Sequence, residues 1–398
     1  MIDIDDPKQG GRFALFNLGF RPFFLGAAGY AVVSVAVWMV IYLTDWSVQP
    51  YGLPASMWHA HEMIFGYAMA VIAGFLLTAV RNWTNIPTLN GTPLLLLCLL
   101  WLVGRIVPFL SDVLLIGVVA LADCLFTLLL IFALSVPIVK ARTWNNLAII
   151  SVLALMLLAQ LSFYLGVAGV VEGGVYYGLY SGLYLIVALI FIMGRRVIPF
   201  FIEKGVGYAV QLTNRRWLDV ASLVLFLCFW VSDLLWPNAP VAAALAALLF
   251  VLHALRLAGW HTSGIWGKPL LWVLYLAYAW MVLAFALKAA VYIFDFSASL
   301  ALHAFAYGGI GMMTMGMMAR VSLGHTGRNI AAPPPWLAWA FALLFIGALV
   351  RVILPLLDPS HYAWWIGLSQ GLWLAAFALF FVIYLPILTR PRIDGRVG

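Results

Sequence analysis

The chain has very few charged residues: 9% of its 398 residues are charged, whereas 66% are hydrophobic. A soluble globular protein carries about a quarter charged residues, so this chain could not cover its own surface with polar groups. Periodic glycine, a large excess of one charge and dense cysteine are also missing, which excludes collagen-like, disordered and disulfide-scaffold proteins. Cys98, Cys124 and Cys228 lie in apolar stretches without CxxC spacing, so we expect buried thiols rather than disulfides or thiolate metal sites.

Apolar runs of about twenty residues recur along the whole sequence, and each is long enough to cross a bilayer as a helix. They predict an all-α integral membrane protein, embedded in a lipid bilayer as a single polytopic domain over residues 1–398. The twelve expected transmembrane helices are 24–43, 58–80, 92–110, 113–136, 145–168, 175–194, 217–236, 239–258, 268–293, 299–320, 333–356 and 361–386.

The basic residues alternate between the two sides of this predicted bundle. Eighteen of the 21 Lys and Arg residues fall in the N-terminal arm, in every second loop and in the C-terminal tail. The other loops contain no Lys or Arg, but they contain Asp45, Asp112, Glu172, Asp295 and Asp358. The positive-inside rule therefore predicts that both termini are cytoplasmic. The net charge of +7 is explained by this topology, so we expect no nucleic-acid partner.

Short matching motifs predict a threefold internal repeat. Spans three and eleven both end in an arginine followed by a proline, at Arg105 and Arg351. The candidate repeats are residues 20–142, 143–262 and 263–390, which would form three four-helix arcs around a pseudo-threefold axis. Short basic matches at membrane edges also arise by chance, so this repeat is an open prediction.

Three histidines are expected at one depth near the outer face. His59 and His61 lie in the first outer turn of span two, and His303 lies in the first outer turn of span ten. Polar residues at membrane depth are costly and often functional. Two imidazoles facing each other, His61 and His303, could ligate a haem iron axially. The alternative is that these histidines bond to headgroups or water at the interface.

A copper site is the second metal hypothesis. His59 and His61 point about 200° apart on a helix, so they cannot both ligate one iron. His59 could therefore face copper, which also favours imidazole. Glu62 lies three residues beyond His59 and could orient that ring or bind the metal directly. Alternatively, Glu62 is a solvated carboxylate near the start of the helix, where its negative charge suits the helix dipole.

Arg105, Lys288 and Arg351 are the three basic residues that lie in the outer leaflet. They could bind the propionates of a haem, because an arginine fork binds carboxylates well. Ion pairs with Asp112, Asp295 or Asp358, or snorkelling to the interface, are the alternatives. His325, in a GHTGR loop, could bind a metal or cap a helix. The methionines between Met312 and Met318 could ligate copper(I), but such runs more often pack helices.

Four motifs resemble those of the NnrS family. They are FRPFFLGAAGY at Phe20–Tyr30, WHAHEMIFGYA at Trp58–Ala68, GRRVIPFF at Gly194–Phe201 and RVSLGHTGR at Arg320–Arg328. The resemblance covers nearly the whole chain. It implies a bacterial inner-membrane protein of twelve helices that contains haem and copper and is linked to the nitric oxide response and denitrification. It also implies that the first candidates for metal binding or support are His59, His61, Glu62, His303 and His325.

The expected architecture also resembles the catalytic subunit of haem–copper oxidases and nitric oxide reductases. That subunit has haem-ligating histidines at the outer ends of spans two and ten. This chain departs from it because span six has Tyr180 and Tyr184 but no histidine, and span seven has no histidine pair. The usual three-histidine copper site is therefore absent, which puts reductase chemistry by that route in doubt.

The leading hypothesis is a membrane protein that binds haem b, together with copper, and protects against nitric oxide. It would bind, oxidise or reduce the gas, or handle electrons for a donor or partner protein. The alternative is a twelve-span secondary transporter, which helices broken by Gly around Gly308–Gly316 would favour. A scaffold without a cofactor is the third hypothesis, and it leaves the intramembrane cations unexplained.

Overall fold

The computed structural model describes residues 13–44, 46, 50–110, 114–237, 239–294 and 296–396. These residues form helices and connecting segments, with no strand among them, which confirms the all-α prediction. Eleven of the helices are long and apolar enough to cross a membrane. The expected tenth span is also helical, without a break, from Ala298 to His325. Its Gly, Thr and His residues make it less apolar than the other spans.

The chain divides into two compact units, described separately below. Unit 1 contains residues 1–182, 318–334 and 377–398, and unit 2 contains residues 183–317 and 335–376. Three helices, α7, α12 and α15, contribute a part to each unit; they span Gly174–Gly205, Met312–His325 and Tyr362–Thr389. The prediction of three repeats stays a prediction.

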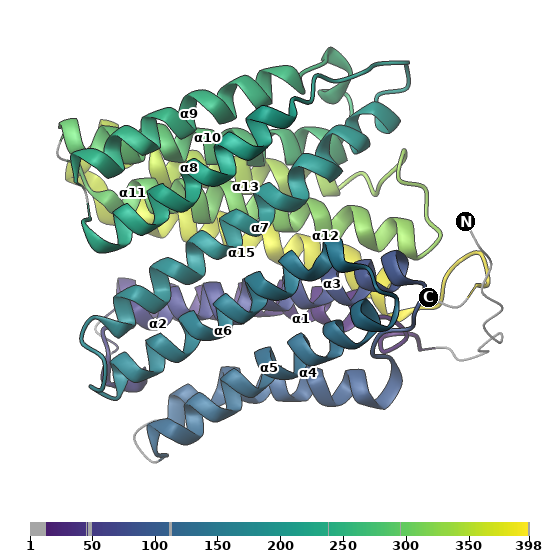
Figure 1. Cartoon of the computed structure of the whole chain (residues 1–398), viewed down its shortest axis with the longest axis horizontal. Helices are drawn as coiled ribbons and strands as arrows, with labels where there is room; N and C mark the ends of the chain where they lie inside the picture. The colour runs from purple at the N-terminus through teal and green to yellow at the C-terminus, as the bar shows by residue number, and fades with distance from the viewer. Residues whose placement is uncertain are drawn as a thin grey trace. The chain divides into compact units, whose positions relative to one another are not determined.

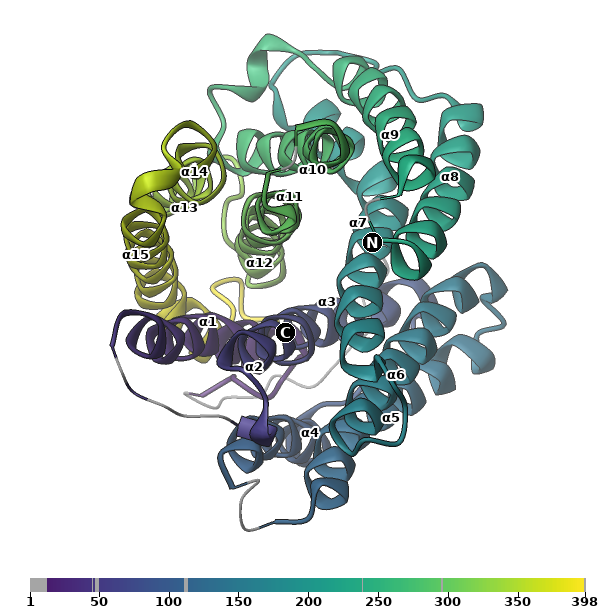
Figure 2. The ribbon, with the colours of Figure 1, turned by 90° about the vertical axis from the view of Figure 1, so that its left-hand side faces the viewer.

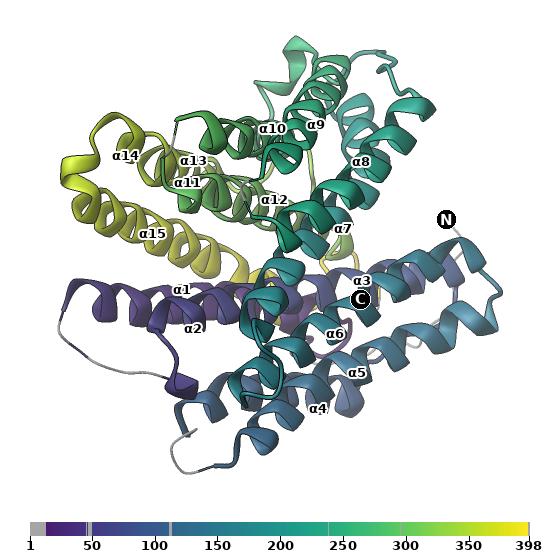
Figure 3. The ribbon, with the colours of Figure 1, turned by 60° about the vertical axis from the view of Figure 1, so that its left-hand side comes forward.

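Unit 1 contains the first five expected spans and parts of the sixth, tenth and twelfth. Its helices α4, α5 and α6 lie side by side, and α1 packs against α3 (Figure 3). The elements of this unit, besides the shared helices, are α1 (Phe20–Leu43), η1 (Pro50–Gly52), α2 (Ala55–His61), η2 (Glu62–Ala68), α3 (Met69–Thr84), α4 (Gly91–Ile106), η3 (Val107–Leu110), α5 (Ile116–Lys140), η4 (Trp144–Asn146) and α6 (Leu147–Val167).

In unit 2, α8, α9 and α10 run alongside one another (Figure 1), and α11 and η6 pack against α10. Figure 2 shows α9 between α8 and α10, and α11 beside α10. Its elements, besides the shared helices, are α8 (Arg216–Leu235), α9 (Pro240–Gly259), η5 (Ser263–Ile265), α10 (Pro269–Phe294), α11 (Ala298–His303), η6 (Ala304–Gly311), α13 (Leu337–Val352), α14 (Leu354–Leu357) and η7 (Pro359–His361).

Polar side chains of α5 point inward, whereas several of its large apolar side chains point outward. On α5, Leu121 is 65% exposed and Phe132 is 67% exposed, but Asp123 and Thr127 are each 1% exposed. This distribution is the reverse of that in a soluble protein. It follows from the bilayer, because lipid accepts apolar side chains and a charged group must find its partners inside the bundle.

Two local predictions differ from the structure. The basic segment 195–216 is not all loop, because α7 continues as far as Gly205. A helix that leaves the membrane can carry charged residues such as Arg195 and Lys204 on its last turns, where their long side chains reach water. All three cysteines are free, but only Cys124 is buried; Cys98 is half-buried and Cys228 is exposed on α8.

A stripe of glycines allows α7 to approach α6 closely within unit 1. Gly174, Gly178 and Gly182 recur every four residues on α7, so they lie on one face. A Cβ atom on Gly178 would lie 2.5 Å from the backbone oxygen of Ala159 on α6. Small residues at this spacing bring membrane helices together because packing, not water exclusion, drives their association.

We expect Gly178→Val to lower the stability of the folded protein by about 1–3 kcal/mol, because the added carbons must push α6 away. Thermal unfolding of the detergent-purified protein measures this loss as a lower midpoint. Gly117→Val on α5 is the control, since a Cβ there would meet no atom within 4 Å. Equal midpoints for the two variants would contradict the close approach of α6 and α7.

Candidate functional site

Two of the predicted site histidines occupy the same kind of local structure. The short helix α2 ends at His61 and continues as the π-helix η2, and α11 ends at His303 and continues as the π-helix η6. π-helical turns are rare and often mark functional sites. The sequence did not predict them. The stretch Gly308–Gly316, where the transporter hypothesis predicts a break, stays helical.

Glycines explain part of this geometry. A Cβ atom on Gly308, in η6, would lie 2.4 Å from the Trp280 ring, so only glycine allows this ring to pack against the helix backbone. A Cβ atom on Gly66, in η2, would lie 2.8 Å from Nη1 of Arg105. The missing side chain of Gly66 therefore makes room for the arginine in the interior of unit 1.

Arg105 is the centre of a buried ion cluster in unit 1. Its Nη1 atom lies 2.5 Å from Oε2 of Glu62, and its Nη2 donates to Oδ1 of Asp123. The ring of His61 lies between the same two carboxylates, with Nδ1 2.9 Å from Glu62 and Nε2 3.3 Å from Asp123. All four side chains are at most 2% exposed. We call these four residues the Arg105 cluster.

Neutral side chains complete the hydrogen bonds of the Arg105 cluster. Asp123 Oδ2 accepts a bond of 2.7 Å from Gln160 and one of 2.9 Å from Tyr164. Tyr30 donates to Glu62, and the Phe163 ring packs 4.4 Å from the ring of His61. Two carboxylates face one guanidinium, so a protonated His61 would supply the second positive charge. Buried charges persist only with such partners.

The Arg105 cluster changes the interpretation of two predicted residues. Arg105 pairs with Glu62 and Asp123, and Glu62 points its oxygens at Arg105, Tyr30 and His61. The alternative partner Asp112 lies outside the described residues. Asp123 was missed by the sequence analysis, although a signal existed, since it is the only charged residue of the expected span 113–136.

Lys288 is held by a second buried pair, in unit 2. Its Nζ atom lies 2.9 Å from Oδ1 of Asp233, and Tyr184 donates a hydrogen bond of 2.6 Å to Oδ2 of the same carboxylate. Asp233 was also missed, although it is an acid inside the expected span 217–236. The alternative partner Asp295 lies outside the described residues. The alternative of an ion pair therefore explains the position of Lys288, but its partner is an acid within a span, Asp233, instead of one of the loop acids.

His303 and Arg351 meet in unit 2. The Nδ1 atom of His303 lies 2.7 Å from the backbone oxygen of Ser299, one turn earlier on the chain. The Nη2 atom of Arg351, on α13, lies 3.1 Å from Nε2 of the same ring and 3.3 Å from the hydroxyl of Ser299. Arg351 is 8% exposed and His303 is half-buried. The structure therefore brings together two of the predicted cofactor-binding residues.

The remaining predicted metal ligands lie in other surroundings. His59 stacks on Trp38 with 5.0 Å between the ring centres. His325 is the last residue of α12, where its ring contacts Phe20 and its backbone oxygen accepts a bond from Arg392. Among the residues that the structure describes, no three His, Cys, Asp or Glu side chains are grouped so that they could hold a metal ion.

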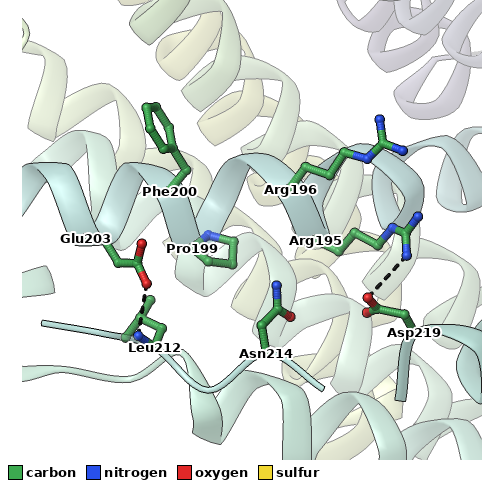
Figure 4. Close-up of a pocket in the computed structure, with 8 residues that line it drawn as sticks. All are labelled: Arg195, Arg196, Pro199, Phe200, Glu203, Leu212, Asn214 and Asp219. Atoms are coloured by element: carbon green, nitrogen blue, oxygen red, sulfur yellow. Dashed lines mark hydrogen bonds and ion pairs between the residues drawn. The ribbon is translucent and has the colours of Figure 1, made fainter. Parts of the chain in front are cut away.

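The GRRVIPFF motif lines a pocket of about 390 Å³ in unit 2 (Figure 4). Three of its polar side chains, those of Arg195, Glu203 and Asp219, bond to one another or to the backbone. Asp219 accepts from Arg195 at 3.1 Å and from Arg256 at 2.8 Å, and Glu203 accepts from the backbone N–H of Leu212. These bonds join α7 to α8, α9 to α8, and the segment after α7 back to α7.

Comparison with known families identifies the chain. A family model described as NnrS protein matches residues 14–392, which is nearly the whole chain. The chain belongs to the NnrS family. A comparison with curated proteins gives no match. Membership confirms the resemblance seen in the four motifs, and it relates this NnrS protein to the nitric oxide response.

Arg105→Gln should destabilise this NnrS protein by roughly 3–5 kcal/mol, because it leaves two buried carboxylates without their guanidinium. Thermal unfolding in detergent measures the effect, and Glu62→Gln in the same chain should restore part of the loss. Arg142→Gln, at an exposed position, is the control. If Arg105→Gln kept the wild-type midpoint, its pairing with Glu62 and Asp123 would not be structural.

Asp233→Asn should likewise lower the unfolding midpoint, since it removes the carboxylate that Lys288 contacts. Adding Lys288→Met should recover stability, because replacing both members of a buried pair with groups of similar shape is often neutral. A double-mutant cycle of unfolding midpoints measures the coupling. If the loss in the double variant equalled the sum of the losses in Asp233→Asn and Lys288→Met, the two side chains would not be coupled. Another group would then stabilise Lys288.

Proposed function

We propose that this NnrS protein binds haem b near the outer face of the bacterial cytoplasmic membrane, with both termini in the cytoplasm, and protects against nitric oxide. Family membership supports the link to nitric oxide. The observation that carries the haem site is the environment of His303. Its Nδ1 lies at hydrogen-bond distance from a backbone oxygen, which is the arrangement that orients metal-bound imidazoles in proteins.

The residues around His303 fit a haem. With Nδ1–H donating to Ser299, Nε2 carries the lone pair that an iron needs. Arg351 Nη2 lies 3.1 Å from that nitrogen and would move aside when an iron binds it. Arg351 lies beside the same ring and could pair with a propionate, because a guanidinium binds carboxylates in a fork. Haem supplies an iron that binds nitric oxide. The protein's part is to hold that iron through His303, to orient the ring through Ser299 and to neutralise a carboxylate through Arg351.

The residues around His61 do not fit the second axial position. Both ring nitrogens face carboxylates of the Arg105 cluster, and aromatic rings enclose the ring. A copper ion at His59 and Glu62 does not fit either, because both oxygens of Glu62 already have partners. The proposal therefore rests on His303, and we derive no step through copper.

Two of the three basic residues predicted to bind haem propionates pair with acidic side chains of the protein instead. Arg105 and Lys288 each have a buried carboxylate within ion-pair distance. Arg351 is the one of the three that lies beside the ring of His303, so it is the cation placed to meet a propionate of a haem held there. We propose nitric oxide as the ligand. The storage of the gas, its conversion or its use with an electron donor would depend on the iron.

His303→Ala should remove most of the Soret absorbance from protein purified with its native haem, because the iron loses its proposed ligand. Absorbance per mole of folded protein is the measurement. His361→Ala is the matched control, since the His361 side chain is 62% exposed and pairs with Asp358 at the short helix η7. We expect the wild-type band in this control, and a shift of that band when nitric oxide is added to the reduced wild-type protein. An unchanged Soret band in His303→Ala would refute the proposed ligand.

A further inference from the structure

Arginines gather at one end of unit 1, where the first turn of α1 meets the last turns of α12 and α15. Arg21 Nη1 donates to the backbone oxygens of Leu388 and Arg390, at 2.8 and 2.9 Å. Arg392 Nη1 donates to the backbone oxygen of His325 at 2.8 Å. The last carbonyls of a helix lack partners inside it, and cations there also suit the helix dipole. Arg21 and Arg392 therefore have a structural role as helix caps.

The C-terminal tail packs against the RVSLGHTGR motif of the family. The backbone N–H of Ile393 donates to the oxygen of Thr326 at 3.3 Å. A Cβ atom on Gly327 would lie 2.9 Å from the carboxyl of Asp394, and Gly327 has a φ angle of +74°, which favours glycine. The glycine of the motif thus allows the tail to lie against the loop and brings Arg390 and Arg392 beside Arg328.

The described part of the C-terminal tail brings one carboxylate to this end, that of Asp394. It accepts two bonds from Arg392, at 2.8 and 2.5 Å. The Arg392 guanidinium accordingly holds the pKa of Asp394 well below its usual range. Arg21 lies within electrostatic range of both Arg328 and Arg392.

Arg328 has a hydrogen-bond donor that the described residues do not satisfy. Its Nη1 atom is buried and has no hydrogen-bond acceptor among them. Burial and the neighbouring charge of Arg390 lower the pKa of Arg328. A buried donor without an acceptor is costly, and like charges add to that cost. An anion with several oxygens would remove both penalties, because it accepts the bond and offsets the charge.

We propose that this end of unit 1 is a phosphate-binding site, in which Arg328 forms the central contact and Arg390 adds charge. Arginine forks match the oxygens of a phosphate, which carries enough of them for more than one guanidinium. The site lies where three membrane helices begin or end, which is the depth of phospholipid headgroups. The phosphate could come from an anionic phospholipid or from a soluble phosphate. The site is independent of the haem proposal.

Binding of phosphatidylglycerol to the purified full-length protein, measured by native mass spectrometry, tests the site. We expect Arg328→Gln to weaken this binding about tenfold, as for one lost charge-assisted bond. Phosphatidylcholine should bind weakly to both proteins, because its choline offsets the phosphate charge. Arg142→Gln is the control, as this exposed arginine at the end of α5 should keep wild-type binding.

Inorganic phosphate distinguishes the two sources. If the site binds lipid, phosphatidylglycerol should bind more tightly than phosphate, and millimolar phosphate should not displace it. If the site binds soluble phosphate, adding phosphate should raise the unfolding midpoint, and Arg328→Gln should abolish that rise. If Arg328→Gln fails to fold, Arg390→Gln is measured instead, since Arg390 is exposed. Equal binding of both ligands to wild type and variant would overturn the proposal. Neither readout depends on haem.

Discussion

A buried charge at membrane depth must find its partner inside the helix bundle, and the interior of this protein is organised around that constraint. Arg105 meets the constraint with Glu62 and Asp123, and Lys288 meets it with Asp233. Lipid offers no water or counter-ion, so an unpaired charge would cost several kcal/mol. Removing Asp233, or Glu62 and Asp123 together, would therefore leave a cation in an environment that cannot solvate it.

The same constraint explains the shape of the helices near these charges. Gly66 has no side chain, so Arg105 can approach the backbone of η2, and the Trp101 indole donates to the oxygen of Gly66 at 3.0 Å. A π-helix has looser backbone pairing than an α-helix, and a side-chain donor can serve a carbonyl that the local geometry leaves available. The π-helix η2 therefore leaves room for Arg105, and the Trp101 indole satisfies a backbone oxygen of η2.

Under the proposed function, ligand binding by this family protein depends on which polar groups remain after the structural pairs are made. Around His61 the protein supplies carboxylates to both nitrogens, whereas around His303 it supplies a backbone oxygen and an arginine. A histidine between two carboxylates belongs to an ion network. A histidine fixed by a carbonyl keeps one nitrogen as a base, which is what a metal requires.

The sequence by itself determined the membrane class, the helical spans and the family, because these follow from composition, from the length of apolar runs and from short motifs. It also placed Arg105, Lys288 and Arg351 among the functional or structural cations. It did not reveal that Asp123 and Asp233 are partners of the first two, since these acids lie 18 and 55 residues away along the chain. Only the tertiary structure decided those pairs, because hydrogen bonds and ion pairs act over a few ångströms, and helix packing alone brings such distant residues within that range.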